Sequence, residues 1–169
     1  MKKIILMAAF VAATLMQTAF AQDTVDQSMR KVIASYLNVK RSLTKDKADS
    51  ASEYAKILSA DLHNVSMDKF TPDQHKAWMQ YYDLLEDGAG SIGKSDNLKN
   101  QRNKFADLSS NFYKMLKALN VNTVDLFYQY CPMADAYWVS ENSKIINPYY
   151  GKQMPTCGST KETLKANNQ

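Results

Sequence analysis

The strongest constraint on this chain is a series of apolar residues at helical spacing over its first 120 positions. Met29, Val32, Ile33 and Tyr36 recur at intervals of three and four, which places them on one face of an α-helix over about 25–43. Similar stripes follow over about 51–65, 78–92 and 98–119. Because short connections join neighbouring helices in opposite directions, the pattern predicts an all-α, antiparallel up-down four-helix bundle over 22–120.

Capping residues indicate where three of these helices begin. Thr71, Pro72 and Gln74 form the pattern of a capping box with proline at the first helical position, so the third helix should begin there. Asp46 or Asp49 is expected to cap the second helix, and Ser95 the fourth. The candidate cap residues are therefore Asp46, Asp49, Thr71 and Ser95.

The pattern changes after residue 120. Residues 124–130 and 136–140 are rich in β-branched and aromatic side chains, which favours extended structure. We expect a short irregular or extended, hairpin-like cap over 121–169 that lies across the bundle and ends in a helical turn near Thr160 to Leu164. Residues 22–169 should form a single domain, since 148 residues are enough for one hydrophobic core.

The N-terminal segment 1–21 has the pattern of a cleaved signal peptide. Lys2 and Lys3 precede an apolar stretch, and Ala19-Phe20-Ala21 provides a cleavage site of small-x-small type. The mature chain is therefore expected to be periplasmic or secreted, with no membrane insertion because no later run of about 18 apolar residues follows. Removing the two lysines lowers the formal charge from +4 to +2, which argues against a nucleic-acid partner.

The last third of the chain holds both cysteines, each close to a methionine. Cys131 and Met133 are two residues apart, so an extended chain would point both at one face, and Met154 and Cys157 are three apart. Proline follows Cys131 and Met154 and restricts the backbone of both. Two thiolates and two thioethers form a ligand set that selects Cu(I) or Ag(I) over Zn(II).

The same cysteines support a second interpretation. Exported proteins favour disulfides, so Cys131 and Cys157 could form a staple in a structural or protein-interaction module without metal chemistry. Met133 and Met154 would then only fill space in the core. The two interpretations are compatible as redox states, because an oxidised pair supplies no thiolates.

Two further residues are second-tier metal candidates. His75 falls in the first turn of the third helix and shares a stripe with Trp78, so it is expected to point inward, either as a ligand or as a core histidine. Trp138 could cover a Cu(I) site by a cation–π contact or pack the cap against the bundle. His63, at the end of the second helix, is expected at the surface.

Enzyme signatures are not found in the sequence. The chain has no G-x-S-x-G, H-E-x-x-H, C-x-x-C-H or glycine-rich phosphate loop, and it has only two histidines. We therefore expect a binding protein and not an enzyme.

Several segments together resemble the DUF3347 family. They are 36–40, 101–109, Cys131-Pro132-Met133-Ala134 with Trp138, and Asn147-Pro148-Tyr149-Tyr150-Gly151 with Met154, Cys157 and Gly158. This family occurs in exported proteins of Bacteroidetes and is similar to a module appended to heavy-metal efflux adaptor proteins of the copper and silver type. The resemblance implies metal binding, with an efflux adaptor or pump component as a partner.

Overall fold

The computed structural model describes residues 27–167, and the predicted signal peptide lies outside them. The first helix covers 27–44 of the described residues. It is followed by α2 (Ala48–His63), the short 3-10 helix η1 (Met67–Lys69), α3 (Pro72–Gly93) and α4 (Leu98–Leu119). None of the helices in this part of the chain is both long enough and apolar enough to cross a membrane.

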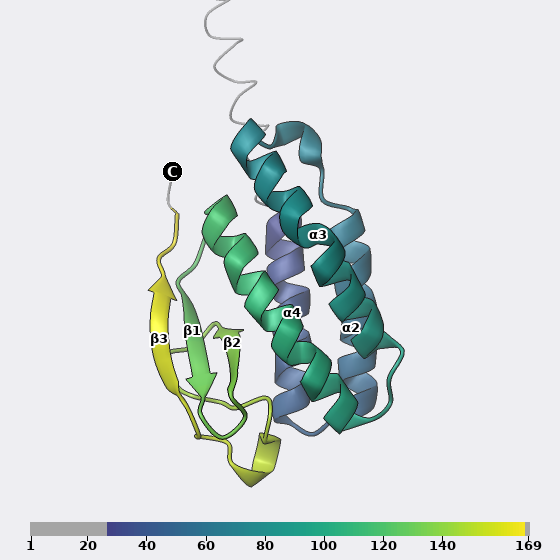
Figure 1. Cartoon of the computed structure of the whole chain (residues 1–169), viewed down its shortest axis with the longest axis vertical. Helices are drawn as coiled ribbons and strands as arrows, with labels where there is room; N and C mark the ends of the chain where they lie inside the picture. Colours follow the sequence, from purple (N-terminus) through teal and green to yellow (C-terminus); the bar gives the residue numbers. More distant parts are fainter. Residues whose placement is uncertain (1–26, 168–169) are drawn as a thin grey trace, which may run out of the picture.

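The four helices pack consecutively and alternate in direction (Figure 1). Ser52, near the start of α2, donates a hydrogen bond to the carbonyl of Gly93 at the end of α3. Gln74, at the start of α3, donates to the carbonyl of Leu119 at the end of α4. The apolar stripes of all four helices form one buried core, so the predicted helical part is confirmed.

The predicted capping box at the start of α3 is also confirmed. The Thr71 hydroxyl accepts from the amide of Gln74, and the Gln74 side chain accepts from the amide of Thr71. The predicted cap of α4 is wrong, because Asn97 and not Ser95 accepts the hydrogen bond from the first turn.

The start of α2 differs from the prediction as well. Lys47 occupies the cap position without a side-chain hydrogen bond, so neither Asp46 nor Asp49 caps the helix. Asp46 has a φ of 58° and turns its carboxylate toward Arg102 on α4. The Asp46 side chain therefore forms an ion pair with a residue distant in sequence, and not the helix cap that the local pattern predicted.

The C-terminal cap is a three-stranded antiparallel sheet, so the fold is mostly helical α+β and the all-α prediction is corrected. Its strands are β1 (Leu126–Cys131), β2 (Ala136–Ser140) and β3 (Ser159–Leu164), in the order β2-β1-β3. The hairpin of β1 and β2 matches the two predicted extended segments. The helical turn predicted over 160–164 is instead β3, which takes its backbone partners from β1 in pairs such as Leu126 with Leu164.

The sheet lies beside the helices, next to α4 (Figure 1). Tyr36 of the first helix connects the two parts: its hydroxyl accepts from the Val139 amide at 3.0 Å and lies 2.7 Å from the Ser109 hydroxyl. Lys40, almost fully buried, binds Ser140 and Glu141 at the end of β2. These contacts fix the sheet and the loop after β2 against the bundle.

Candidate metal centre

The two cysteines meet where β1 ends and β3 begins. Cys131 is the last residue of β1 and is fully buried, and Cys157 precedes β3 and is partly buried. The antiparallel pairing of Tyr130 with Ser159 brings the two segments together. The Sγ atoms lie 3.2 Å apart, and both thiols are free.

This separation suits two different chemical outcomes. A disulfide bond is about 2.05 Å long, so bonding requires the sulfurs to approach by roughly 1.2 Å. Two thiolates that each lie about 2.3 Å from one tetrahedral ion are roughly 3.8 Å apart, so ion binding requires a smaller movement outward. The backbone thus places both sulfurs within reach of one ion.

The turn after β1 surrounds the Cys131 sulfur with hydrogen-bond donors. Burial acts to raise the pKa of Cys131, but hydrogen bonds from the Cys157 thiol, the amides of Ala134 and Met133, and the side chain of Asn147 outweigh it and lower the pKa. Donors to the charged form of a group favour that form. Cys131 is therefore the first thiol of the pair to lose its proton.

The pKa of Cys157 shifts in the opposite direction. Its hydrogen bond to Cys131, together with burial, raises the pKa of the Cys157 thiol, although the Met133 amide partly opposes this. When the reduced pair has lost one proton, the Cys157 thiol keeps the other and donates a hydrogen bond to the Cys131 thiolate. Such a pair titrates as one unit in two steps.

If the pair binds Cu(I), as expected from the sequence, this arrangement predicts how the affinity for Cu(I) depends on pH. Between the lowered pKa of Cys131 and the raised pKa of Cys157, the pair holds one proton, so binding releases one proton per ion and log affinity rises with a slope of about one. Below the Cys131 pKa, two protons are released and the slope approaches about two. Affinity therefore falls as the pH falls. Anaerobic titration over a pH series checks this, and a flat profile would contradict it.

The two methionines contact the cysteines through their backbones: the Met133 amide donates to the cysteine sulfurs, and the Met154 carbonyl accepts from the Cys157 amide. Met133 is in the turn between β1 and β2 and is 62% exposed, so the extended backbone expected at this position is wrong. Met154 follows the 3-10 helix η2 (Gly151–Gln153) and is 36% exposed. Its backbone carbonyl accepts a hydrogen bond from the Cys157 amide at 3.3 Å. We call Cys131, Met133, Met154 and Cys157 the sulfur site.

Asn147, which the sequence pattern did not single out as functional, organises the segment that carries Cys157. It is fully buried, and its side-chain oxygen accepts from the amides of Tyr149 and Tyr150. Its side-chain nitrogen donates to the carbonyl of Cys157 at 2.8 Å. The dipeptide Asn147-Pro148 is a turn signal and could have indicated this role.

An ion pair fixes the same segment to the helices. Arg102 of α4 pairs with Asp46 at 2.5 Å and donates to the carbonyls of Pro148 and Leu43. Burial acts to raise the pKa of Asp46, but the Arg102 hydrogen bond and the Lys152 amide outweigh it and lower the pKa. The carboxylate therefore stays charged and keeps the segment 148–152 in place.

His75 is not part of the sulfur site, contrary to the inward orientation expected for it. Its side chain is exposed in the first turn of α3, the turn from which Gln74 donates to the Leu119 carbonyl at the end of α4. Arg102, which contacts the sulfur-bearing segment, lies 17 residues earlier on α4, or about 25 Å along the helix. His63 is exposed, as predicted.

Trp138 packs inside the cap. It is fully buried, and its ring meets that of Tyr149 edge-on with centroids 6.0 Å apart. A Cβ at Gly158 would lie 2.9 Å from the Trp138 ring, which shows how closely the backbone after Cys157 approaches it. Trp138 thus supports the segment after Cys157 from inside.

The candidate ligands of the sulfur site are two thiols and two thioethers. Within residues 27–167, no three His, Cys, Asp or Glu side chains are grouped to hold a metal ion. The members of the sulfur site carry sulfur donors, the ligand type that suits Cu(I) and related ions.

Comparison with known proteins places the helical part of the chain in a family. The family described as "Protein of unknown function (DUF3347)" matches residues 32–124, which begin within the first helix, include α2, α3 and α4, and end just before β1. The sulfur site lies beyond the matched residues. No curated protein and no solved structure matches the chain. Since 93 of the 169 residues match, the chain belongs to the DUF3347 family.

Proposed function

We propose that this protein is a periplasmic or secreted binding protein for Cu(I) or Ag(I), acting in metal sequestration, delivery or efflux and not as an enzyme. The observation that carries the proposal is the pair of free thiols 3.2 Å apart, in which hydrogen bonds lower the pKa of Cys131. Met133 and Met154, both exposed and joined to the cysteines by backbone hydrogen bonds, are the proposed thioether ligands.

In this proposal the ion takes the place of the proton between the two sulfurs. Cys131 supplies the first thiolate, and Cys157 becomes the second when its proton is released. The amides of Met133 and Ala134 stabilise the negative charge on Cys131. These groups belong to a turn already held by the sheet, so little ordering is needed when the ion binds.

The exposed methionines are the first ligands that an arriving ion would meet. Met133 and Met154 have flexible side chains, and their sulfurs carry no charge, so they bind a soft ion without releasing a proton. The ion then exchanges its thioether ligands for the thiolates of Cys131 and Cys157 and so moves inward. The resemblance of the chain to modules of efflux adaptors supports an adaptor or pump component as the partner that receives it.

A second candidate is a disulfide-stapled structural or interaction module. It is favoured by the same 3.2 Å separation, because a small approach of the sulfurs would form the bond. Closing the loop of 27 residues from Cys131 to Cys157 would stabilise the fold by about 3.5 kcal/mol in the chain-entropy model.

The methionines distinguish the two candidates. If the site binds Cu(I), the double change Met133→Leu with Met154→Leu should lower Cu(I) affinity at least about tenfold, since even outer partners of a metal site contribute that much. Anaerobic titration of the reduced protein against a chromophoric chelator measures the affinity. Intact mass of the untreated protein, measured in parallel, counts its free thiols.

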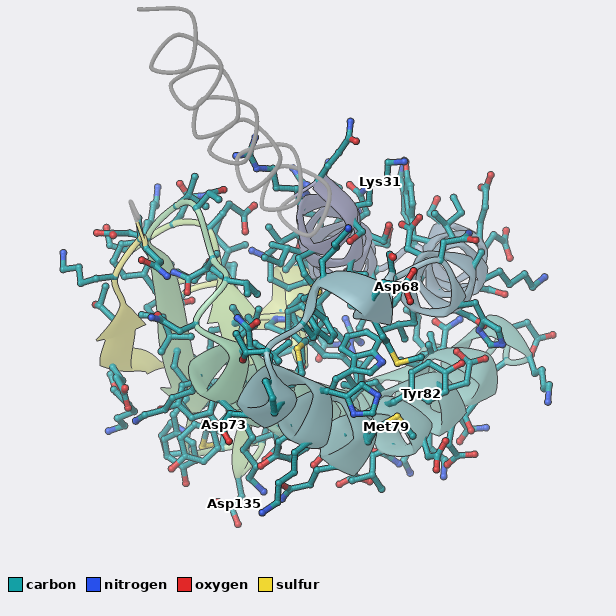
Figure 2. The ribbon with its side chains drawn as sticks, turned by 90° about the horizontal axis from the view of Figure 1, so that it is seen from above. Lys31, Asp68, Asp73, Met79, Tyr82 and Asp135 are labelled. Atoms are coloured by element: carbon teal, nitrogen blue, oxygen red, sulfur yellow. The ribbon has the colours of Figure 1, made fainter. Side chains whose placement is uncertain are left out.

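Met79→Leu is the matched control. Met79 is 51% exposed on α3, well away from Asp135 of the β1–β2 turn (Figure 2), and its replacement should leave the affinity unchanged. Wild-type protein that binds no Cu(I), with a mass two hydrogen atoms below that of the dithiol, would instead support the disulfide module.

A further inference from the structure

A groove of about 570 Å³ adjoins the sulfur site. One wall is the start of α4, and the other is formed by the turn after β1 and the segment 149–153. Its polar and sulfur-bearing lining residues are Lys99, Arg102, Asn103, Met133, Tyr150 and Gln153. The amides of Met133 and Ala134, which both line the groove, donate hydrogen bonds to the Cys131 sulfur, so a molecule in the groove would lie beside the turn that holds this thiol.

The charge of the groove favours an anion. Its lining includes two cationic side chains and no carboxylate. Arg102 is already paired with Asp46, whereas Lys99 is exposed and has no ion pair among the described residues. Asn103 and Gln153 add side-chain amides that can donate hydrogen bonds.

The size of the groove suits a small molecule. Sites for small ligands usually measure about 300–1,000 Å³ and combine apolar walls with a few polar groups. Here the side chains of Leu98, Ala106 and Met133 supply apolar surface, and the polar groups lie among them.

We propose that this groove binds an anionic low-molecular-weight thiol that carries the soft ion, so that Cu(I) arrives as a thiolate complex and not as a free ion. This inference rests on the proposed function and specifies its substrate. Lys99 attracts the carboxylates of the carrier, and Met133 contacts the ion while the carrier is still bound.

The transfer is a ligand exchange without a change in oxidation state. Each bond from copper to a carrier sulfur is replaced by a bond to Cys131 or Cys157. The proton that Cys157 loses passes to one departing carrier thiolate, and the other carrier leaves as a thiolate. Copper remains Cu(I), so no oxidant or reductant is required.

Cu(I) transfer from two matched carriers tests this proposal. Glutathione and its diethyl ester have the same thiol, but the ester lacks the two carboxylates. Stopped-flow mixing of the reduced protein with each Cu(I) complex measures the transfer rate. We expect Lys99→Glu to slow transfer from glutathione about tenfold relative to transfer from the ester.

Lys104→Glu is the control. Lys104 is exposed on the same helix but does not line the groove, so the same charge change there should leave the ratio of the two rates unchanged. The groove proposal would be overturned if Lys99→Glu slowed transfer from both carriers equally, or if Lys99→Glu and Lys104→Glu changed the ratio of the two rates equally. Cu(I) binding itself would remain intact in either case. Failure of the wild type to take Cu(I) from either carrier or from solution would instead contradict the proposed function.

Discussion

Replacing Cys131 with serine is expected to lower the affinity for Cu(I) by more than about 100-fold, because outer partners of metal sites alone contribute about 10–100-fold. Cys131 has the lower thiol pKa of the pair and accepts the hydrogen bond from Cys157. A serine hydroxyl keeps its proton near neutral pH and is a poor ligand for a soft ion. Competition with a Cu(I) chelator under anaerobic conditions measures the loss.

Cys157→Ser provides the comparison for this variant. It removes the other thiol from a less buried position, so a similar loss of affinity is expected with less disturbance of the core. Circular dichroism verifies that both variants remain folded. If either folded variant bound Cu(I) as tightly as the wild type, the two-thiolate site would be refuted.

Gly151→Ala is expected to destabilise the protein by about 3 kcal/mol. Gly151 has a φ of 52°, a left-handed conformation that costs a residue with a side chain about 1–2 kcal/mol. The added Cβ would lie 2.0 Å from the Asp46 carboxylate and 2.5 Å from the Arg102 guanidinium, so the charged hydrogen bond between them, worth about 1.5–3 kcal/mol, is disturbed. Urea denaturation measures the free energy of unfolding.

The same substitution should also weaken Cu(I) binding, because Gly151 begins the 3-10 helix that leads to Met154. Gly90→Ala is the control: apart from the adjacent backbone of α3 itself, nothing lies within 4 Å of an added Cβ there, so the change should stabilise the protein by about 0.5–1 kcal/mol. A Gly151→Ala variant as stable as the wild type would show that the Asp46–Arg102 pair does not hold this segment.

The helices were predictable because their information is local. The stripe through Met29, Val32 and Tyr36 requires only the spacing of apolar residues, and the capping box of Thr71 and Gln74 is complete within four residues. His75 was wrongly predicted to face inward, because the spacing of apolar residues does not determine which side chains in the first turn of a helix face solvent. Asp46 was misassigned because its partner, Arg102, is 56 residues away.

The third strand was not predictable from the local pattern. Residues 159–164 read Ser-Thr-Lys-Glu-Thr-Leu, with no alternation of apolar and polar side chains, and the first three are exposed. They form a strand because β1 supplies backbone partners 29 to 38 residues away in sequence, such as Leu126 for Leu164. That pairing also brings Cys157 to Cys131, so the close approach of the thiols depends on a contact that local spacing does not contain.

X-ray absorption spectroscopy at the copper edge, on the reduced protein loaded with one Cu(I), tests the central claim most directly. The sulfur site predicts a first shell of sulfur scatterers alone, with one or both thioether contributions lost in the Met133→Leu, Met154→Leu variant. A first shell that contains nitrogen or oxygen, or one unchanged in that variant, would contradict binding by Cys131, Met133, Met154 and Cys157.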